Sequence, residues 1–211
     1  MESLTTTSKQ VAEMITRSGW HVLLACCDMK NAYKCLPVTM EQRSLQGFSF
    51  LGKLFIDLRL VFGDKMACLC FDRFHYCIIE YFVRPVAPIP QSWTGRTIDD
   101  VPVVAPPNAL AVLEKFTKTY KDQLSRLNIE YAPVDSEKRK AFDMETEGEV
   151  LGIVFNTTEM SWRLPGGKVA LLIRDIVQMI KPGVLLSLNE VEIVHGKLCY
   201  FSQHCSPIKL F

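Results

Sequence analysis

The segment Thr97-Ile98-Asp99-Asp100-Val101-Pro102-Val103-Val104 places two adjacent carboxylates directly before an apolar run. With the preceding Ser92-Trp93-Thr94-Gly95-Arg96, it predicts a short hairpin that carries Asp99 and Asp100 at its tip. Paired carboxylates suit Mg²⁺, which takes oxygen ligands and commonly binds one or two carboxylates together with substrate phosphates. An Asp-Asp pair alone is more often a solvated turn, because Asp forms local hydrogen bonds there. The neighbouring elements of the sequence therefore decide between a metal site and a solvated turn.

The segment from Trp20 to Cys27 is apolar for almost its whole length and ends at Asp28. It is too short for a typical helix and favours a strand covered on both faces. A helix is predicted before it, opened by a Thr7–Gln10 capping box and ending near Ser18. After it, two strands flanking a turn at Leu51-Gly52 predict a hairpin.

The next elements alternate between helix and strand. Apolar residues at helical spacing predict a helix from Asp64 to about Val83, ended by prolines. They are Met66, Leu69, Cys70, Phe74, Cys77, Ile78 and Tyr81. A second amphipathic helix follows Pro106-Pro107-Asn108 and is closed by Asn128. Further predicted elements are strands at Ile129–Val134, Glu149–Phe155 and Trp162–Leu164, a helix from about Pro165 to Ile180, and a last helix opened by the capping box of Ser187 and Glu190.

Without the 45–60 hairpin, the order from Trp20 to Val134 is β-α-β-β-α-β. This is the order of the ferredoxin-like, split βαβ fold of the α+β class, with an antiparallel sheet and packed helices. In that topology the first strand lies antiparallel beside the third. The predicted fold therefore brings Asp28 close to Asp99 and Asp100.

Bulk composition predicts a folded protein of a reducing compartment. Hydrophobic residues make up 48% of the 211 residues and the formal net charge is +1, so neither disorder nor a strongly basic surface is predicted. The eight cysteines form no CxxC pair, which argues against zinc. The longest apolar run, Val22–Cys27, is too short to span a bilayer. The N-terminus lacks a signal peptide, which favours a cytoplasmic or nuclear location over secretion.

Five segments in order resemble the palm of a retroelement reverse transcriptase, most closely those of LTR-type or tyrosine-recombinase-type retrotransposons. The resemblance covers roughly residues 20 to 205. The matching segments are Asp28–Tyr33 (D-x-x-x-A-Y), Leu58–Ala67 (L-R-L-x-F-G), Thr97–Asp100 (x-x-D-D), Val150–Ile153 with Leu164-Pro165 (L-G and L-P), and Leu188–Phe201. Departures from the family pattern are Thr97 for an aromatic residue, Val61 for proline, and Cys68 for a residue that is often proline.

The resemblance implies a division of the chain into three parts. Residues 1–19 form an N-terminal helix that is a remnant of the fingers, and residues 20–155 form the palm with a fingers-like hairpin at 45–60. Residues 156–211 form the start of a helical thumb or connection. Only 27 residues precede Asp28, so a truncated fragment that is a poor polymerase by itself is expected.

The resemblance also implies a site for two-metal nucleotidyl transfer. Asp28, Asp99 and Asp100 are expected to be catalytic and to hold two Mg²⁺ or Mn²⁺ ions. Tyr33 stands at the family's sugar-gate position, although a core tyrosine is the simpler interpretation. The other expected substrate-binding residues are Phe62, Gly63, Lys65 and Lys138, with Lys140 as the alternative to Lys138. The four histidines are scattered and suggest no common site.

The expected partners are an RNA or DNA template with its primer, deoxynucleoside triphosphates and other retroelement-encoded domains, and no membrane is expected. One alternative is a catalytically inactive remnant, domesticated or decayed, that acts as a binding or structural domain. Another is a ferredoxin-like RNA-binding module, which would stack bases on aromatic residues of its central strands. The candidate strands Val22–Cys27 and Val101–Ala105 carry none.

Overall fold

The computed structural model describes residues 6–61, 63–132 and 141–204. The chain divides into two compact units, residues 1–151 with 155–161 and residues 152–154 with 162–211. Among the described residues, no helix is long and apolar enough to cross a membrane.

The first unit begins with helix α1 (Ser8–Ser18), and the predicted capping box is present. Thr7 accepts a hydrogen bond from the amide of Gln10, whose side chain accepts one from the amide of Thr7. Gly19 follows the helix with φ at +91°, a conformation that glycine adopts without a Cβ penalty. The sequence signals for both ends of this helix are therefore confirmed.

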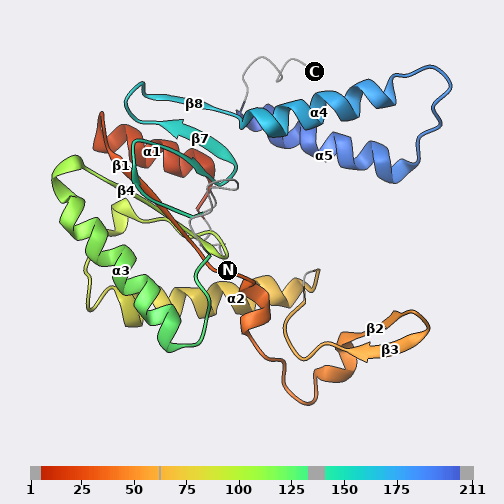
Figure 1. Ribbon diagram of the computed structural model, residues 1–211, viewed down its shortest axis with the longest axis horizontal. Helices are drawn as coiled ribbons and strands as arrows, with labels where there is room; N and C mark the ends of the chain where they lie inside the picture. The colour runs from red at the N-terminus through yellow and green to blue at the C-terminus, as the bar shows by residue number, and fades with distance from the viewer. Residues whose placement is uncertain (1–5, 62, 133–140, 205–211) are drawn as a thin grey trace. The chain divides into compact units, whose positions relative to one another are not determined.

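The central sheet of this unit has the strand order β4-β1-β5 (Figure 1). The predicted strand before Asp28 is β1 (Leu23–Asp28), and β4 (Asp100–Ala105) follows the Asp-Asp turn. They pair antiparallel in an unbroken register from Leu23 opposite Ala105 to Asp28 opposite Asp100. The third strand, β5 (Phe142–Glu145), pairs antiparallel with the other edge of β1.

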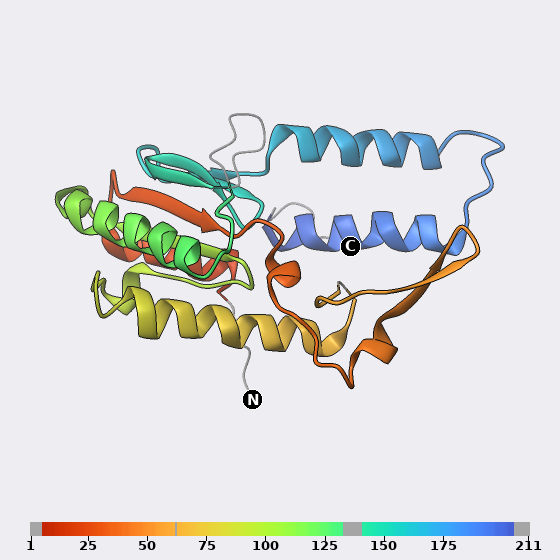
Figure 2. The ribbon, with the colours of Figure 1, turned by 60° about the horizontal axis from the view of Figure 1, so that its bottom comes forward.

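The long helices pack with this sheet. Helix α2 (Lys65–Cys77) continues as the π-helical segment η3 (Ile78–Val83), which contacts α3 (Leu110–Arg126). Helix α3 also contacts β4 and β5 (Figures 1 and 2). Along β1, Ala25 and Cys27 belong to the core cluster that includes residues of α2 and α3. Because side chains alternate along a strand, Cys26 and Asp28 face the opposite side of the sheet.

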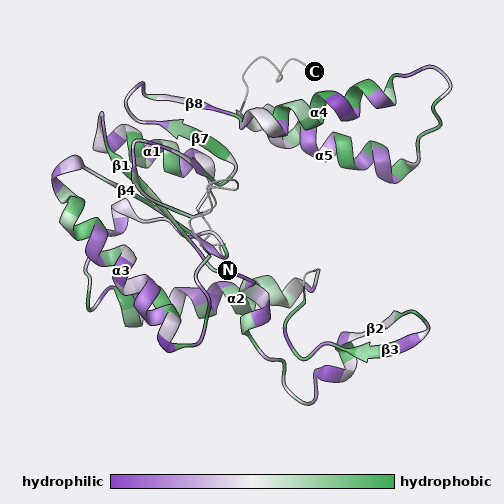
Figure 3. Ribbon diagram, in the orientation of Figure 1, coloured by the Kyte–Doolittle hydropathy of each residue, from purple (hydrophilic) through white to green (hydrophobic). Residues whose placement is uncertain are grey.

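A second hairpin consists of β2 (Gly47–Phe50) and β3 (Lys53–Ile56). The predicted turn at Leu51-Gly52 is present, and both of its residues have positive φ. All eight strand residues are exposed, including Phe48, Phe50, Leu54 and Phe55. Figure 3 shows β3 as hydrophobic and lying away from the β4-β1-β5 sheet.

A further sheet has the order β6-β7-β8, formed by Glu147–Val150, Ile153–Asn156 and Ser161–Arg163. The second unit contains α4 (Gly166–Met179) and α5 (Leu188–His204). Its small core joins Leu172 of α4 to Val194 and Phe201 of α5. Ser187 and Glu190 form the predicted cap of α5.

Three details of the predicted fold differ from the structure. The segment 149–155 is not one strand, because Leu151 and Gly152 both have positive φ and turn the chain between β6 and β7. In the described part of 129–134, only Tyr131 forms a strand-like bridge, with Met29, and β5 lines the edge of β1 instead. The α2 residues Met66 and Leu69 are exposed, while the helix buries Ala67, Phe71 and His75.

The fold class is thus confirmed only in its coarser form. Helices pack with small antiparallel sheets, and β1 lies beside the strand after the Asp-Asp turn, as the split βαβ order requires. The described central sheet has three strands. The complete split βαβ arrangement therefore stays a prediction.

Candidate functional site

Asp28 and Asp100 lie directly opposite each other at one end of the central strand pair. Directly opposed residues of antiparallel strands project from the same face, with Cα atoms about 4.5–5.5 Å apart. The register therefore joins two of the three predicted carboxylates on the sheet face away from the α2 and α3 core. Asp28 is buried, with 5% of its surface exposed, whereas Asp99 and Asp100 are half-buried.

Asp99 lies in the tight turn of the Asp hairpin, residues 94–103. In this hairpin β4 follows an arm that pairs with it only through isolated bridges at Thr94 and Thr97. The amide of Thr97 donates to the carbonyl of Asp100 and the amide of Asp100 donates to that of Thr97, both at 2.8 Å. Ile98, between them, has φ at +49°. Left-handed backbone is unfavourable for a β-branched residue and costs on the order of 1–3 kcal/mol. Surrounding contacts must hold this turn in place.

The chain before α1 provides one of those contacts. Thr6 runs alongside the Asp hairpin: its amide donates to the carbonyl of Arg96 at 2.6 Å, and its hydroxyl accepts from the amide of Arg96 at 2.8 Å. The hydroxyl of Thr97 donates to the carbonyl of Thr6. Arg96 itself is buried and forms an ion pair with Asp72 of α2.

His75 provides a second contact with the turn. Its ring is fully buried, with Nδ1 in hydrogen-bond contact with the carbonyl of Ile98 and Nε2 at 2.8 Å from Oη of Tyr120. Burial lowers the pKa of His75 to about 4, and the charge of Arg96 adds to this, against the hydrogen bond to Ile98. The sequence pattern did not single out His75, because a lone histidine on an apolar helix has no local signature.

The charges of the three carboxylates all affect the pKa of one buried thiol, that of Cys26. Burial raises the pKa of Cys26 well above its usual value, and the charges of Asp100, Asp28 and Asp99 raise it further, together with Cys27. Cys26 shares the strand face of Asp28. The buried thiol of Cys26 thus lies on the same sheet face as Asp28 and Asp100.

The carboxylates do not form a complete metal cage. Among the described residues, no group of three or more His, Cys, Asp or Glu side chains has the arrangement to hold a metal ion. The donor set fits Mg²⁺ in a restricted sense, because Mg²⁺ commonly uses one or two carboxylates and completes its shell with water and substrate phosphates. The Asp28–Asp100 pair with Asp99 beside it satisfies that lesser requirement.

Tyr33 lies close to this site but within the core. Its side chain is buried, its ring centroid is 5.4 Å from that of Phe71, and its hydroxyl is 2.8 Å from Sγ of Cys68. Burial raises the pKa of Tyr33, followed by its contact with Cys68 and the charge of Asp99. The structure thus agrees with the core interpretation, and the role as a sugar gate stays a prediction.

Of the remaining predicted substrate-binding residues, the structure describes only some. Phe62, Lys138 and the alternative Lys140 lie outside the described residues. Lys65 is the first residue of α2, and its side chain is not described. Gly63 has φ at +95°, and a Cβ added there would meet no atom within 4 Å. The described residues therefore do not assemble a nucleotide pocket from this set.

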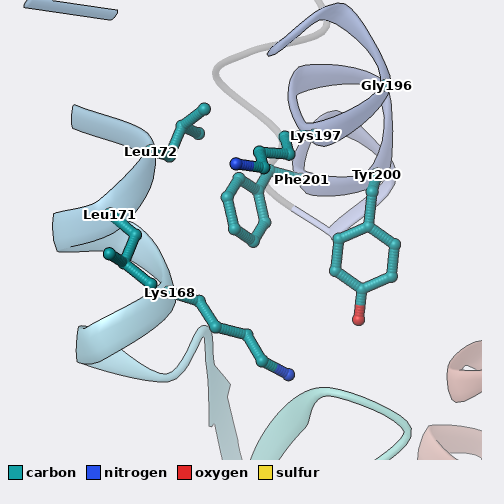
Figure 4. Close-up of a pocket in the computed structure, with 7 residues that line it drawn as sticks. All are labelled: Lys168, Leu171, Leu172, Gly196, Lys197, Tyr200 and Phe201. Atoms are coloured by element: carbon teal, nitrogen blue, oxygen red, sulfur yellow. The ribbon is translucent and has the colours of Figure 1, made fainter. Parts of the chain in front are cut away.

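The second unit contains an apolar pocket of about 380 Å³ between α4 and α5. Figure 4 shows its lining, which is Lys168, Leu171, Leu172, Gly196, Lys197, Tyr200 and Phe201. Nζ of Lys197 forms an ion pair with Asp175 at 2.7 Å. None of the predicted catalytic or substrate-binding residues lines this pocket, so it is separate from the candidate site.

Neither a protein-family model nor a curated protein matches the sequence. The structure is similar to that of the foamy viral protease-reverse transcriptase in complex with double-stranded DNA, with a TM-score of 0.58 and 14% identity over 95% of this chain and 36% of that chain. For the same viral protein in complex with an RNA/DNA hybrid, the TM-score is 0.57 and the identity 16%, over 97% of this chain and 25% of that chain. The native prototype foamy virus protein gives 0.52 and 14%, over 91% and 25%.

This chain therefore spans between a quarter and about a third of the solved chains that it resembles. At this level of identity, the similarity concerns the fold alone. It confirms the resemblance in its coarser form, without distinguishing a type of retroelement. The chain has a reverse-transcriptase-like fold.

Proposed function

We propose that this chain is the palm region, with the start of a thumb, of an RNA-directed DNA polymerase from a retroelement. The single observation that carries the proposal is the Asp28–Asp100 cross-strand pair, with Asp99 in the adjoining strained turn, within a reverse-transcriptase-like fold. An LTR-type or tyrosine-recombinase-type retrotransposon is the proposed source, on the sequence motifs. The proposed location is cytoplasmic or nuclear.

Asp28, Asp99 and Asp100 are the residues that would hold two Mg²⁺ or Mn²⁺ ions. When bound, such ions supply charge stabilisation to the attacking and leaving oxygens of a phosphoryl transfer. The protein's own contribution is to place the carboxylates of Asp28 and Asp100 on one face of the sheet, with Asp99 next to them in the chain. Since the described carboxylates form no complete cage, the ions are expected to bind tightly only together with a nucleoside triphosphate.

The substrate of this site would be a deoxynucleoside triphosphate on a primed RNA or DNA template. Tyr33 would limit the space at the sugar, with its ring held by Phe71 and its hydroxyl by Cys68. Phe62, Gly63 and Lys65 are the further proposed pocket residues, and Lys138 the one near the leaving pyrophosphate. Other domains of the retroelement are the proposed protein partners.

A non-catalytic remnant is the second candidate, and one observation favours it. The described residues contain no group of three side chains that is ready to hold a metal ion. A fold that is retained after catalysis has been lost would keep its core and its Asp hairpin while losing its affinity for metal-bound nucleotide. The two candidates therefore differ in whether the carboxylates bind a divalent cation with a nucleotide.

The test is equilibrium binding of a fluorescent deoxynucleoside triphosphate to the full chain in the presence of Mn²⁺. Asp28→Asn and Asp100→Asn should each weaken binding by tenfold or more, while the exposed Asp122→Asn on α3 is the charge-matched control. Without metal, Asp28→Asn should leave stability unchanged or slightly higher, because it removes one of several like charges. Binding that is absent, or equal in all four proteins, would support the remnant instead.

A further inference from the structure

The Asp hairpin has a feature that the metal chemistry does not use. Ile98 holds a left-handed backbone conformation at the point from which Asp99 and Asp100 project. Its side chain packs against the core cluster, which fixes one side of the residue. Its carbonyl oxygen is fixed separately, by Nδ1 of His75.

We propose that His75 is a positioning residue for the Asp99–Asp100 turn, donating its Nδ1 hydrogen to the Ile98 carbonyl and so locking the backbone from which both carboxylates project. This inference rests on the proposed function, because the turn needs locking only if its carboxylates serve a metal site. His75 lies near the end of α2, 23 positions before Ile98, so the contact ties the hairpin to the long helix.

The hydrogen-bond partners of His75 determine its tautomer. The carbonyl of Ile98 can only accept a hydrogen bond, so Nδ1 must carry the hydrogen. Nε2 then has a lone pair, and Tyr120 donates its hydroxyl hydrogen to it across 2.8 Å. Burial keeps the imidazole neutral, since the pKa of His75 falls to about 4. The donor to Ile98 is therefore present throughout the neutral range.

The ring of His75 is packed against two aromatic side chains. It is fully buried, with its centroid 5.9 Å from that of Phe71 and 5.9 Å from that of Tyr120. Tyr120 is also fully buried, on α3. The hydrogen bonds from Tyr120 to His75 and from His75 to Ile98 thus connect α3 and α2 to the turn that carries Asp99 and Asp100.

The first test needs no variant. In the full-length wild-type chain, ¹⁵N-resolved NMR of the histidine rings should show His75 as the neutral Nδ1–H tautomer. The Nε2–H tautomer would overturn the proposal, because its Nδ1 could not donate to Ile98.

The second test compares three variants by amide hydrogen exchange at Asp100, whose amide donates within the turn. His75→Gln loses the donor at the Nδ1 position and should speed exchange at Asp100 about tenfold, beyond any change in global stability. His75→Asn retains an amide donor near that position and should restore slow exchange. Tyr120→Phe removes only the remote hydrogen bond and should stay near wild type. Equal exchange in all four proteins would overturn the role.

Mn²⁺-dependent binding of the fluorescent deoxynucleoside triphosphate, measured as for the proposed function, separates this inference from that function. His75→Gln should weaken binding several-fold, and Asp100→Asn should weaken it more. If Asp100→Asn has no effect, the proposed function fails, whereas the exchange data still decide the role of His75. If His75→Gln does not fold, the wild-type tautomer and His75→Asn decide it.

Discussion

Two hairpins of the first unit have opposite surroundings. The Asp hairpin is held by β1, by Thr6 and by His75, and its strand β4 is almost entirely buried. The β2–β3 hairpin exposes all of its strand residues, although it is the more aromatic of the two. Apolar content therefore does not decide burial here; pairing with the central strand does.

The largest expected loss of unfolding free energy follows from removing one partner of a buried ion pair. Arg96→Met in the Asp hairpin removes the partner of Asp72 and leaves a carboxylate largely out of water. Breaking a buried ion pair from one side costs about 3–5 kcal/mol of unfolding free energy. Arg17→Met is the control, because its pair with Glu13 is well exposed and should contribute less than about 1 kcal/mol. Urea unfolding of both variants measures this, and equal losses would contradict the account.

The next effect is a pH dependence of the free energy of unfolding, caused by His75 of α2, which contacts the Asp hairpin at Ile98. His75 has a folded-state pKa of about 4 against an ordinary value of 6.5, mainly because of burial and secondarily through Arg96. Between these values the unfolded chain binds the proton and the folded chain does not. The contribution of His75 to the free energy of unfolding is thus fully present above pH 6.5. It decreases toward pH 4 by up to about 1.4 kcal/mol per pH unit.

Urea unfolding at pH 7.0, 6.0 and 5.0 measures this slope. His75→Gln should lack the component that belongs to the imidazole, and its slope over this range should be shallower than that of the wild type. An identical slope in the two proteins would show that His75 titrates normally and is not buried as the structure has it.

A glycine in each hairpin gives a matched comparison. A Cβ at Gly95 would lie 2.7 Å from side-chain atoms of Thr6, whereas at Gly47 its nearest neighbours are 3.9 Å away. Gly95→Ala should therefore displace Thr6 from the Asp hairpin and cost about 1–3 kcal/mol, as overpacking does. Gly47→Ala should be close to neutral. Thermal unfolding checks the pair, and a tolerated Gly95→Ala would argue against the contact with Thr6.

The smallest expected effect on stability is in the β2–β3 hairpin. Leu54 is 78% exposed, so Leu54→Lys should change the unfolding free energy by less than about 0.5 kcal/mol. Removing an exposed apolar side chain should also reduce self-association, which light scattering measures. The fully buried Leu113→Ala should cost about 2–5 kcal/mol by comparison. A large loss from Leu54→Lys would mean that the hairpin is covered in solution.

The prediction from sequence was most accurate for the pairing of β1 with β4, where local sequence signals and the position in the fold agree. The order of helices and strands that contains the apolar run before Asp28 and the turn at Asp99-Asp100 predicted that their strands pair, and the register confirms it. The turn at Leu151-Gly152 was missed, since the run from Glu149 to Phe155 reads as one strand unless Gly152 is given the weight of a turn residue.

Tertiary contacts explain the other differences. His75 acquires its role from the Ile98 carbonyl and the Tyr120 hydroxyl, 23 and 45 positions away in the chain, and no local pattern encodes that. The strand predicted at 129–134 is reduced in its described part to one bridge, from Tyr131 to Met29, beyond the residues of β1 that pair with β5. Exposed Met66 and Leu69 show that apolar spacing alone did not identify the buried side of α2.

The central claim, that Asp28, Asp99 and Asp100 bind divalent cations at one end of the β1–β4 pair, can be tested by Fe²⁺-directed backbone cleavage. Fe²⁺ bound in place of Mg²⁺ reduces added hydrogen peroxide to hydroxide and a hydroxyl radical, and ascorbate reduces the resulting Fe³⁺ back to Fe²⁺. The full chain with a nucleoside triphosphate should therefore be cut near Asp28 and near Asp99–Asp100. Excess Mg²⁺ and Asp28→Asn should each suppress both cuts. Cleavage elsewhere, for example at the exposed His195–Cys199 pair on α5, with none near Asp28 or Asp100, would contradict the account.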